Sequence, residues 1–289
     1  MLAKFPPNLR WVVKAAFAIF LFLVLVGTTY QGVATALERR ELERPGRFVD
    51  VGGHQLHIHC LGQGLPTVVL EAAAGGMSAA WGWVQPEVAR VTRVCSYDRA
   101  WLGWSEGGDD EYSAARTLEE LHTLLTNANE QGPFVLVGHE LGATVVRDFA
   151  FRFGSETAAV IFVQEPGART DLFVRWWPWL ARVGVLRALG TLSNQAASLP
   201  RESGNAMRIF LHRPDHLARA SREALRADAP EPGTSLPVVD SSIPVMALTT
   251  VSGGRPAMLA TREQAAPITQ VVRDTVLRLR DQPSAFATP

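Results

Sequence analysis

The chain has 289 residues, of which 28 are basic and 28 acidic, so its formal net charge is zero. A neutral chain lacks the basic surface of a nucleic-acid-binding protein, and the 47% apolar content excludes an intrinsically disordered chain. Charged residues make up only 19% of the chain, against about 25% in typical soluble domains. Part of the protein is therefore expected to face something other than water.

An apolar segment near the N-terminus accounts for part of this deficit. Residues 11–37 contain one charge, Lys14, and a helix of about 20 such residues crosses a hydrocarbon core about 30 Å thick. Trp11 and Tyr30 lie where interfacial aromatic residues are expected. The sequence therefore predicts a tail over 1–10, a transmembrane helix over 11–37 and a linker over 38–46.

A cleaved signal peptide is the alternative interpretation, because the start is basic and Ala34-Thr35-Ala36 resembles a cleavage site. That site lies well past the strongest apolar stretch, so an uncleaved single-pass anchor is favoured. Basic residues flank the segment on both sides. The short tail favours an N-terminus on the inner side of the membrane, with a periplasmic or other extracytoplasmic main domain.

From residue 47 onward, short apolar strands alternate with helical segments. Apolar runs that alternate with amphipathic helices predict an α/β fold whose mainly parallel, twisted sheet is covered on both faces. The first two strands flank Gly52-Gly53 and are expected to form a hairpin. The expected strands are 47–51, 54–61, 66–71, 92–98, 133–138, 158–164 and 243–250, and the expected helices between them are 114–130 and 141–153.

Residues 167–240 interrupt this alternation. They contain Trp176-Trp177-Pro178-Trp179, apolar residues at helical spacing and several arginines, which predicts a helical cap inserted between two parts of the core, 47–166 and 241–289. The tryptophan-rich stretch has two interpretations that the sequence does not separate. It either lies in the membrane interface, as helices with Trp on one face and Arg on the other do, or lines a pocket as a lid.

The two cysteines, Cys60 and Cys95, each fall in an apolar strand. Two buried free thiols is the simpler interpretation. A disulfide requires that the two strands be neighbours and that the compartment be oxidising.

The most informative stretch is Val135–Ala143, VLVGHELGA. An apolar strand runs into a tight turn and then a helix, and glycines stand two residues before and two residues after the centre. This pattern is typical of the nucleophile elbow, G-x-S-x-G, which holds a side chain above a sheet at a helix N-terminus. The central residue here is Glu140 rather than serine.

On these residues the chain resembles the α/β-hydrolase superfamily, and in particular its membrane-anchored bacterial members. The stretches that carry the resemblance are VDVGGHQLHIHCLGQG, PTVVLEAAAGG, TRVCSYDRAWLGWS and GPFVLVGHELGA. The resemblance implies a nucleophile at Glu140 and oxyanion donors from the backbone of Leu141 and Ala74. A carboxylate cannot replace serine in acyl transfer, and glutamate is longer than the aspartate that some members use to attack carbon.

The family's catalytic histidine follows the final strand, but the last histidine of this chain is His216, within the cap. The eighth strand and its histidine loop are therefore expected to be absent, and His212 or His216 is the nearest substitute. Glu165 follows the sixth strand, where some members place the acid, and is interpreted as a capping or salt-bridge residue. Asp98, Arg99 and His139 are interpreted as structural.

These observations favour a catalytically degenerate pseudoenzyme, either ligand-binding or an accessory subunit of a membrane complex. The alternative is an active hydrolase of epoxides, halides or esters that uses Glu140. No cofactor and no metal are predicted, because His57 and His59 alternate on a strand without further ligands. The expected partners are the lipid bilayer, other membrane-protein subunits and a small apolar ligand, but not nucleic acid.

Overall fold

The computed structural model describes most of the chain, namely residues 7–108, 113–163, 172–190, 192, 196–227, 238–248 and 261–281. Its centre is a seven-stranded sheet with the order β1-β2-β4-β3-β5-β6-β7. The first two pairings, β1 with β2 and β2 with β4, are antiparallel, and the other four are parallel. The strands are β1 Arg47–Asp50, β2 Gln55–Leu61, β3 Thr67–Glu71, β4 Val94–Tyr97, β5 Phe134–His139, β6 Thr157–Val163 and β7 Val245–Leu248.

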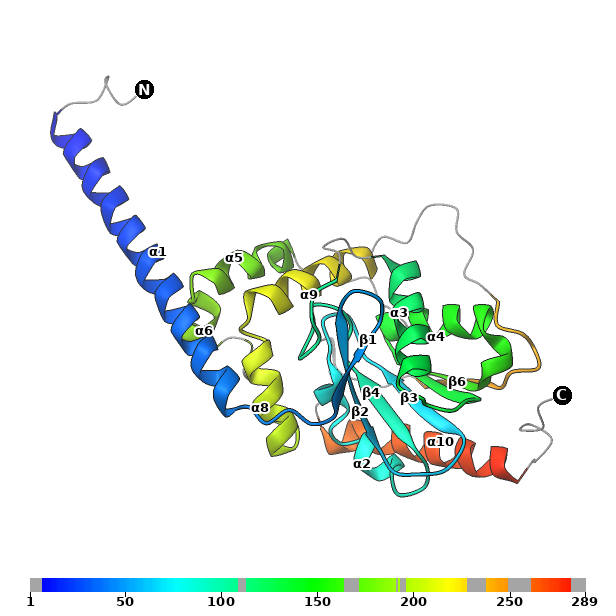
Figure 1. Ribbon diagram of the computed structural model, residues 1–289. Helices are drawn as coiled ribbons and strands as arrows, with labels where there is room; N and C mark the ends of the chain where they lie inside the picture. The colour runs from blue at the N-terminus through cyan, green and yellow to red at the C-terminus, as the bar shows by residue number, and fades with distance from the viewer. Residues whose placement is uncertain are drawn as a thin grey trace.

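Helices cover both faces of this sheet (Figure 1). On one face, α3 (Ala114–Asn127) and α4 (Leu141–Arg152) pack with the sheet around buried residues such as Leu121 and Phe149. On the other face, α2 (Gln85–Val88) and α10 (Arg262–Arg280) pack around Val84 and Ile268. Strands such as β3 and β5 are buried along their whole length, as expected when both faces of a sheet are covered.

A third apolar cluster joins the cap to the loop after β3. It includes Leu186, Met207 and Phe210 of the cap and Met77 of the loop. Among the described residues, the short 3-10 helices are η2 Ser78–Trp81, η3 Gly154–Glu156 and η4 Leu172–Trp176, and the cap begins with η4. In the described part of the cap, the α-helices are α5 Trp177–Arg182, α6 Val185–Leu189, α8 Arg201–Phe210 and α9 Pro214–Ala227. Helices therefore occupy the described part of the predicted insertion, between β6 and β7. They lie between the N-terminal helix and the sheet (Figure 1).

The N-terminal helix α1 runs without interruption from Pro7 to Glu41. Among the described residues, its segment Leu9–Glu38 is the one helix long and apolar enough to cross a membrane. Its N-terminal half projects away from the rest of the protein (Figure 1). The helix continues four residues beyond the predicted span because Glu38 to Glu41 lack a glycine or proline that would end it; the first such break is Pro45-Gly46.

The preferred interpretation of the cysteines is wrong. Strands β2 and β4 are neighbours, Cys60 lies directly opposite Cys95, and the two form a disulfide. The sequence could not reveal this, because β4 pairs with β2 only after the chain has passed through β3 at another place in the sheet. The predicted absence of an eighth strand concerns residues 249–260, which lie outside the described part of the chain.

Candidate functional site

The turn after β5 has the geometry that the sequence pattern predicts. Glu140 has φ 50° and ψ −110°, between the last residue of β5 and the first residue of α4. A side chain larger than glycine rarely adopts a positive φ, so this backbone is strained. The neighbouring strand holds it in place, since the Glu140 amide donates to the Val163 carbonyl over 3.1 Å. Glu140 therefore sits at the carboxyl edge of the sheet and at the positive end of the α4 dipole.

The two glycines of the motif are required by close backbone contacts. A Cβ at Gly138 would lie 2.4 Å from the Gly142 carbonyl oxygen, and a Cβ at Gly142 would lie 2.5 Å from the Glu71 carbonyl oxygen. Both distances are far below van der Waals contact, and the obstructing atoms belong to the backbone. The glycines thus let β5, α4 and β3 approach closely enough to form the elbow.

The loop after β3, which carries the second expected oxyanion donor, is tied down by buried side chains on both sides. The guanidinium of Arg99 donates to the carbonyls of Ala72 (2.8 Å) and Ala73 (2.7 Å). From cap helix α9, Glu223 accepts from the Gly75 amide at 2.8 Å, and His216 donates to the Gly75 carbonyl at 3.1 Å. Ala74 lies in the middle of this segment, so buried hydrogen bonds join the cap to the loop on either side of it.

A buried network of ionisable side chains underlies this loop. Arg99 pairs with Glu71 at the end of β3 and with Glu223 in the cap, and each of the three side chains is at most 2% exposed. Tyr97 donates to Glu71, and Arg219 donates to Glu223 at 3.0 Å. Burial raises the pKa of Glu71 despite the nearby Arg99. For Glu223 burial acts in the same direction, but the attraction of Arg99 outweighs it and lowers the pKa.

Asp98 and His57 form a second buried pair, with 3.0 Å between His57 Nδ1 and Asp98 Oδ2. Asp98 also accepts the backbone amides of Ser78 (2.6 Å) and Trp104 (3.0 Å). Burial alone would lower the pKa of His57, but the Asp98 carboxylate raises it above the ordinary value. All of these contacts join β2, β4 and the loops that follow β3 and β4. The structural interpretation of Asp98 and Arg99 therefore agrees with their buried positions.

His216, the last histidine of the chain, is buried, and both of its ring nitrogens are occupied. Nε2 donates to the Gly75 carbonyl, and Nδ1 accepts the Gly103 amide at 3.1 Å. These bonds require the neutral ring, and burial lowers its pKa to about 4. A histidine held in this way cannot accept a proton from a nucleophile without losing a bond to the backbone. His216 therefore fixes the loop rather than acting as a base.

The low pKa of His216 predicts that stability depends on pH. The unfolded chain, with a histidine pKa of 6.5, takes up this proton as the pH falls below 6.5, whereas the folded protein resists it until about pH 4. The free energy of unfolding is therefore expected to be highest above pH 6.5 and to fall by up to about 3 kcal/mol towards pH 4. Urea unfolding above pH 6.5 and at pH 4 measures this difference. The pKa values of His59 and His212 are also lowered, so these two residues contribute in the same direction. A His216→Gln variant with an unchanged pH slope would contradict the assignment.

The structure places the other residues that the sequence singled out at separate positions. His212 lies in the cap close to α1, where its carbonyl accepts from Gln31 at 2.8 Å. His139 is buried at the end of β5, with its ring edge-on to Trp81. Glu165 lies outside the described residues. Cys60, Cys95 and Glu130 come close enough together for a metal ion, but the two sulfurs are bonded to each other.

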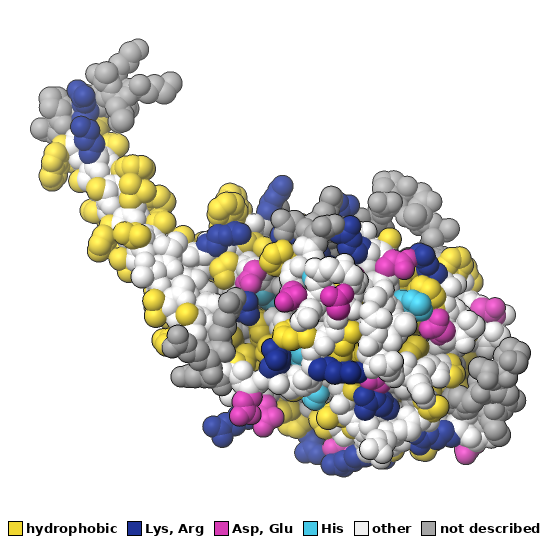
Figure 2. All heavy atoms as spheres, in the orientation of Figure 1, with side chains coloured by type: hydrophobic (Ala, Val, Ile, Leu, Met, Phe, Trp, Pro, Cys, Tyr) yellow, Lys and Arg dark blue, Asp and Glu magenta, His cyan; other side chains and the backbone are white. Residues whose placement is uncertain are grey.

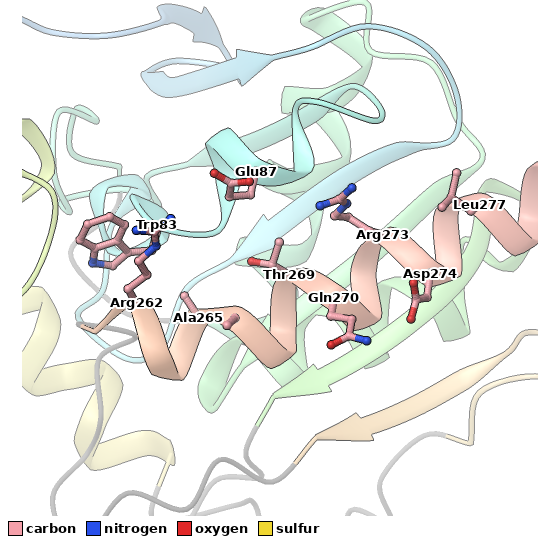
Figure 3. Close-up of a pocket in the computed structure, with 10 residues that line it drawn as sticks. Trp83, Glu87, Arg262, Ala265, Thr269, Gln270, Arg273, Asp274 and Leu277 are labelled. Atoms are coloured by element: carbon pink, nitrogen blue, oxygen red, sulfur yellow. The ribbon is translucent and has the colours of Figure 1, made fainter.

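Glu140 does not line either of the following two cavities. One, of about 440 Å³, is lined by Trp83, Glu87 and one side of α10, on the outer surface of the protein (Figure 3). The other, of about 510 Å³, lies between the end of α1, the loop after β4 and the cap helices α8 and α9. Trp104, Phe210 and Arg213 line it, together with His216. Its size is typical of small-molecule sites, which occupy about 300–1,000 Å³.

Sequence reasoning missed Glu71 and Glu223. Glu71 ends an apolar strand, and Glu223 lies among the arginines of a cap helix, where a solvated charge is the ordinary interpretation. A carboxylate at the end of a fully buried strand was the one available signal for Glu71, since such a group needs a buried partner. Glu223 lies 124 residues from Arg99, and nothing local indicates their contact.

Comparisons with known proteins agree with this geometry. A sequence model of the alpha/beta hydrolase family matches residues 56–284. A Schizosaccharomyces pombe protein of uncharacterised function is 32% identical over 120 residues, 38% of this chain and 22% of that protein. A 2-hydroxy-6-oxo-2,4-heptadienoate hydrolase of Pseudomonas putida is 28% identical over 130 residues, 44% of this chain and 47% of that enzyme. The chain thus spans less than half the length of these curated relatives.

Solved structures show the same architecture at low sequence identity. A thermophilic esterase from Thermogutta terrifontis superimposes with a TM-score of 0.58 and 17% identity. The superposition covers 82% of this chain and 99% of the esterase.

Proposed function

Since the chain belongs to the α/β-hydrolase family, we propose that it is a membrane-anchored member that has lost hydrolytic turnover and acts by binding. The proposal rests on the residue found at the elbow and on the bonds made by the last histidine of the chain. The elbow holds Glu140 where acyl transfer needs a hydroxyl or thiol. The last histidine of the chain, His216, has both ring nitrogens bonded to backbone groups.

The rigid connection between cap and core supports the same conclusion. Enzymes that admit substrate through a mobile lid open and close it during each turnover. Here Glu223 and His216 of the cap hold both polar groups of Gly75 in the loop after β3, and Glu223 also pairs with the buried Arg99. Opening the cap would break these buried bonds and leave charged groups without partners, which is costly.

Binding has a candidate location in the cavity between α1, the loop after β4 and the cap. Aromatic side chains such as Trp104 and Phe210 offer apolar surface, and the ion pair of Arg213 with Asp215 supplies polar groups. We propose that a small amphipathic ligand occupies it, or that the protein acts as an accessory subunit of a membrane complex. Extraction in a gentle detergent separates the two roles, since an accessory subunit co-purifies with defined proteins in a fixed ratio.

The anchor and the disulfide support a membrane location with an extracytoplasmic main domain. The segment Leu9–Glu38 has the length and composition of a spanning helix. The Cys60–Cys95 disulfide is the kind of bond that persists in oxidising compartments outside the cytoplasm.

Assays of the full chain on short p-nitrophenyl esters, epoxides and haloalkanes test the loss of turnover. We expect no hydrolysis above that of a Glu140→Gln variant. We expect none from Glu140→Ser either, because a serine without its histidine is slower by a factor of about 10⁶ in a comparable hydrolase.

Two results would contradict the proposal. Turnover in the wild type that disappears in Glu140→Gln would favour the alternative in which this carboxylate is catalytic. Turnover that appears in Glu140→Ser would mean that a base lies within reach of the elbow after all.

A further inference from the structure

The lower part of α1 is packed against the cap. A Cβ at Gly27 would lie only 2.2 Å from the Val183 carbonyl oxygen, so the helix and the turn between α5 and α6 touch through their backbones. One turn further along, Gln31 is 4% exposed; it donates to the His212 carbonyl at 2.8 Å and accepts from Arg187 at 3.0 Å. The helix is therefore fixed to the cap rather than joined to it by a flexible linker.

These contacts define where a bilayer would end along α1. From Leu9 to Gly27 the helix rises about 27 Å, at 1.5 Å per residue, which matches a hydrocarbon core of about 30 Å. Beyond Gly27, the polar contacts of Gln31 and the ion pair of Glu38 with Arg187 belong outside the hydrocarbon. The boundary therefore falls near Tyr30, an aromatic residue suited to the interface. The turn Val183–Gly184 lies at this level.

At the same level, the cap exposes large apolar side chains on its surface. Trp176, Trp179 and Leu189 are 58%, 63% and 69% exposed. We call this set the cap face. The exposed Arg182 accompanies it, with its guanidinium 5.0 Å from the centre of the Trp179 ring. Hydrophobic and basic side chains gather on the cap next to the apolar surface of α1 (Figure 2). Exposed tryptophans cost free energy in water but are favourable in the headgroup region of a bilayer.

We infer that the cap face is inserted into the interfacial region of the same bilayer that α1 crosses. The occupant is lipid rather than a partner protein because the face is continuous with the exposed apolar surface of α1 and stands at the level where the hydrocarbon ends. The tryptophans and Leu189 enter the boundary of the acyl chains, and Arg182 reaches the phosphates. The main domain is then held in one orientation by two contacts, the spanning helix and the cap face.

This inference rests on the membrane insertion of α1 proposed above. Its test therefore places one probe on α1 and one on the cap face. The full chain is reconstituted in nanodiscs of phosphatidylcholine and phosphatidylglycerol, with and without doxyl-labelled lipid. A bimane fluorophore is attached to one introduced cysteine at a time. Phe20→Cys reports on α1, Leu189→Cys on the cap face, and Phe151→Cys on α4 serves as the matched control. These side chains are 59%, 69% and 63% exposed, so labelling disturbs no packed core.

We expect doxyl lipid to lower the emission at positions 20 and 189 by a factor of roughly two or more and to leave position 151 unchanged. A nitroxide quenches a fluorophore only at short range, and only the first two side chains would lie in the bilayer or at its headgroup–acyl boundary. Quenching at 20 but not at 189 overturns the inference and leaves the anchor intact. Absence of quenching at 20 overturns the membrane insertion itself. Equal quenching at 189 and 151 also overturns the inference, because it would show no preferred face.

A second variant tests whether the contact at Gly27 sets the position of the cap. Gly27→Leu places a side chain where the Val183 carbonyl now lies, so it must push the cap away from α1. Quenching at Leu189→Cys is expected to fall towards the value at Phe151→Cys, while quenching at Phe20→Cys is retained. Unchanged quenching at 189 would show that the cap face does not depend on its contact with α1, and would overturn this part of the inference.

Discussion

Replacing Arg99 by methionine is expected to lower the free energy of unfolding by about 3–5 kcal/mol, one of the two largest effects of any change considered. Arg99 is the only cation between Glu71 and Glu223 that bonds to both of them among the described residues, and all three side chains are buried. Methionine fills a similar volume but leaves two carboxylates without their shared counter-ion. Glu223 keeps Arg219, so Glu71 is expected to bear most of the penalty and to become protonated.

Urea unfolding of the full chain in a mild detergent, followed by tryptophan fluorescence, measures this loss. The matched control is Arg152→Met, whose partner Glu119 lies at 2.6 Å but is exposed, as is Arg152 itself. We expect the control to lose no more than about 1 kcal/mol, as surface pairs do. The combined variant Arg99→Met, Glu71→Gln, Glu223→Gln should recover part of the loss, since it removes the unpaired charges together. Similar losses in the free energy of unfolding for Arg99→Met and Arg152→Met would contradict the importance assigned to the buried network.

The fold could be predicted from the sequence because its signals are local. The strands ending at Glu71 and His139 are apolar on both faces, and the helices between strands have one apolar side. Each pattern reports burial directly. The elbow was predictable for the same reason, because Gly138 and Gly142 mark close backbone contacts that a short segment must satisfy.

The features that decide the chemistry could not be predicted, because they depend on contacts between distant residues. The bond from Gly103 to His216 joins positions 113 residues apart, and that from Gly75 to Glu223 joins positions 148 apart. Sequence alone leaves His216 as a possible base, and only the cap's position shows that its two nitrogens are occupied. The contacts of Gln31 with Arg187 and His212 join positions 156 and 181 residues apart, so the anchor could be predicted but not its attachment to the cap.

Removing the disulfide by the double substitution Cys60→Ala, Cys95→Ala is expected to lower the free energy of unfolding by about 3–4 kcal/mol. The bond closes a loop of 35 residues, and the chain-entropy model assigns about that much stabilisation to a cross-link of this length. It joins β2 to β4 at the point where the sheet changes from antiparallel to parallel pairing. Without it, the hairpin of β1 and β2 is held to the rest of the sheet mainly by the β2–β4 ladder.

Reductant provides the internal control for this second prediction. Dithiothreitol should lower the stability of the wild type to the level of the double variant and leave the double variant unchanged. A thiol-specific alkylating agent, added to the denatured wild type without reductant, should label neither cysteine. Labelling of both, with no effect of reductant on stability, would show that the thiols are free and would remove the disulfide from the arguments for an extracytoplasmic domain. A protein made in a reducing cytosol should then match the exported protein in stability, whereas a structural disulfide requires the exported form to be the more stable one.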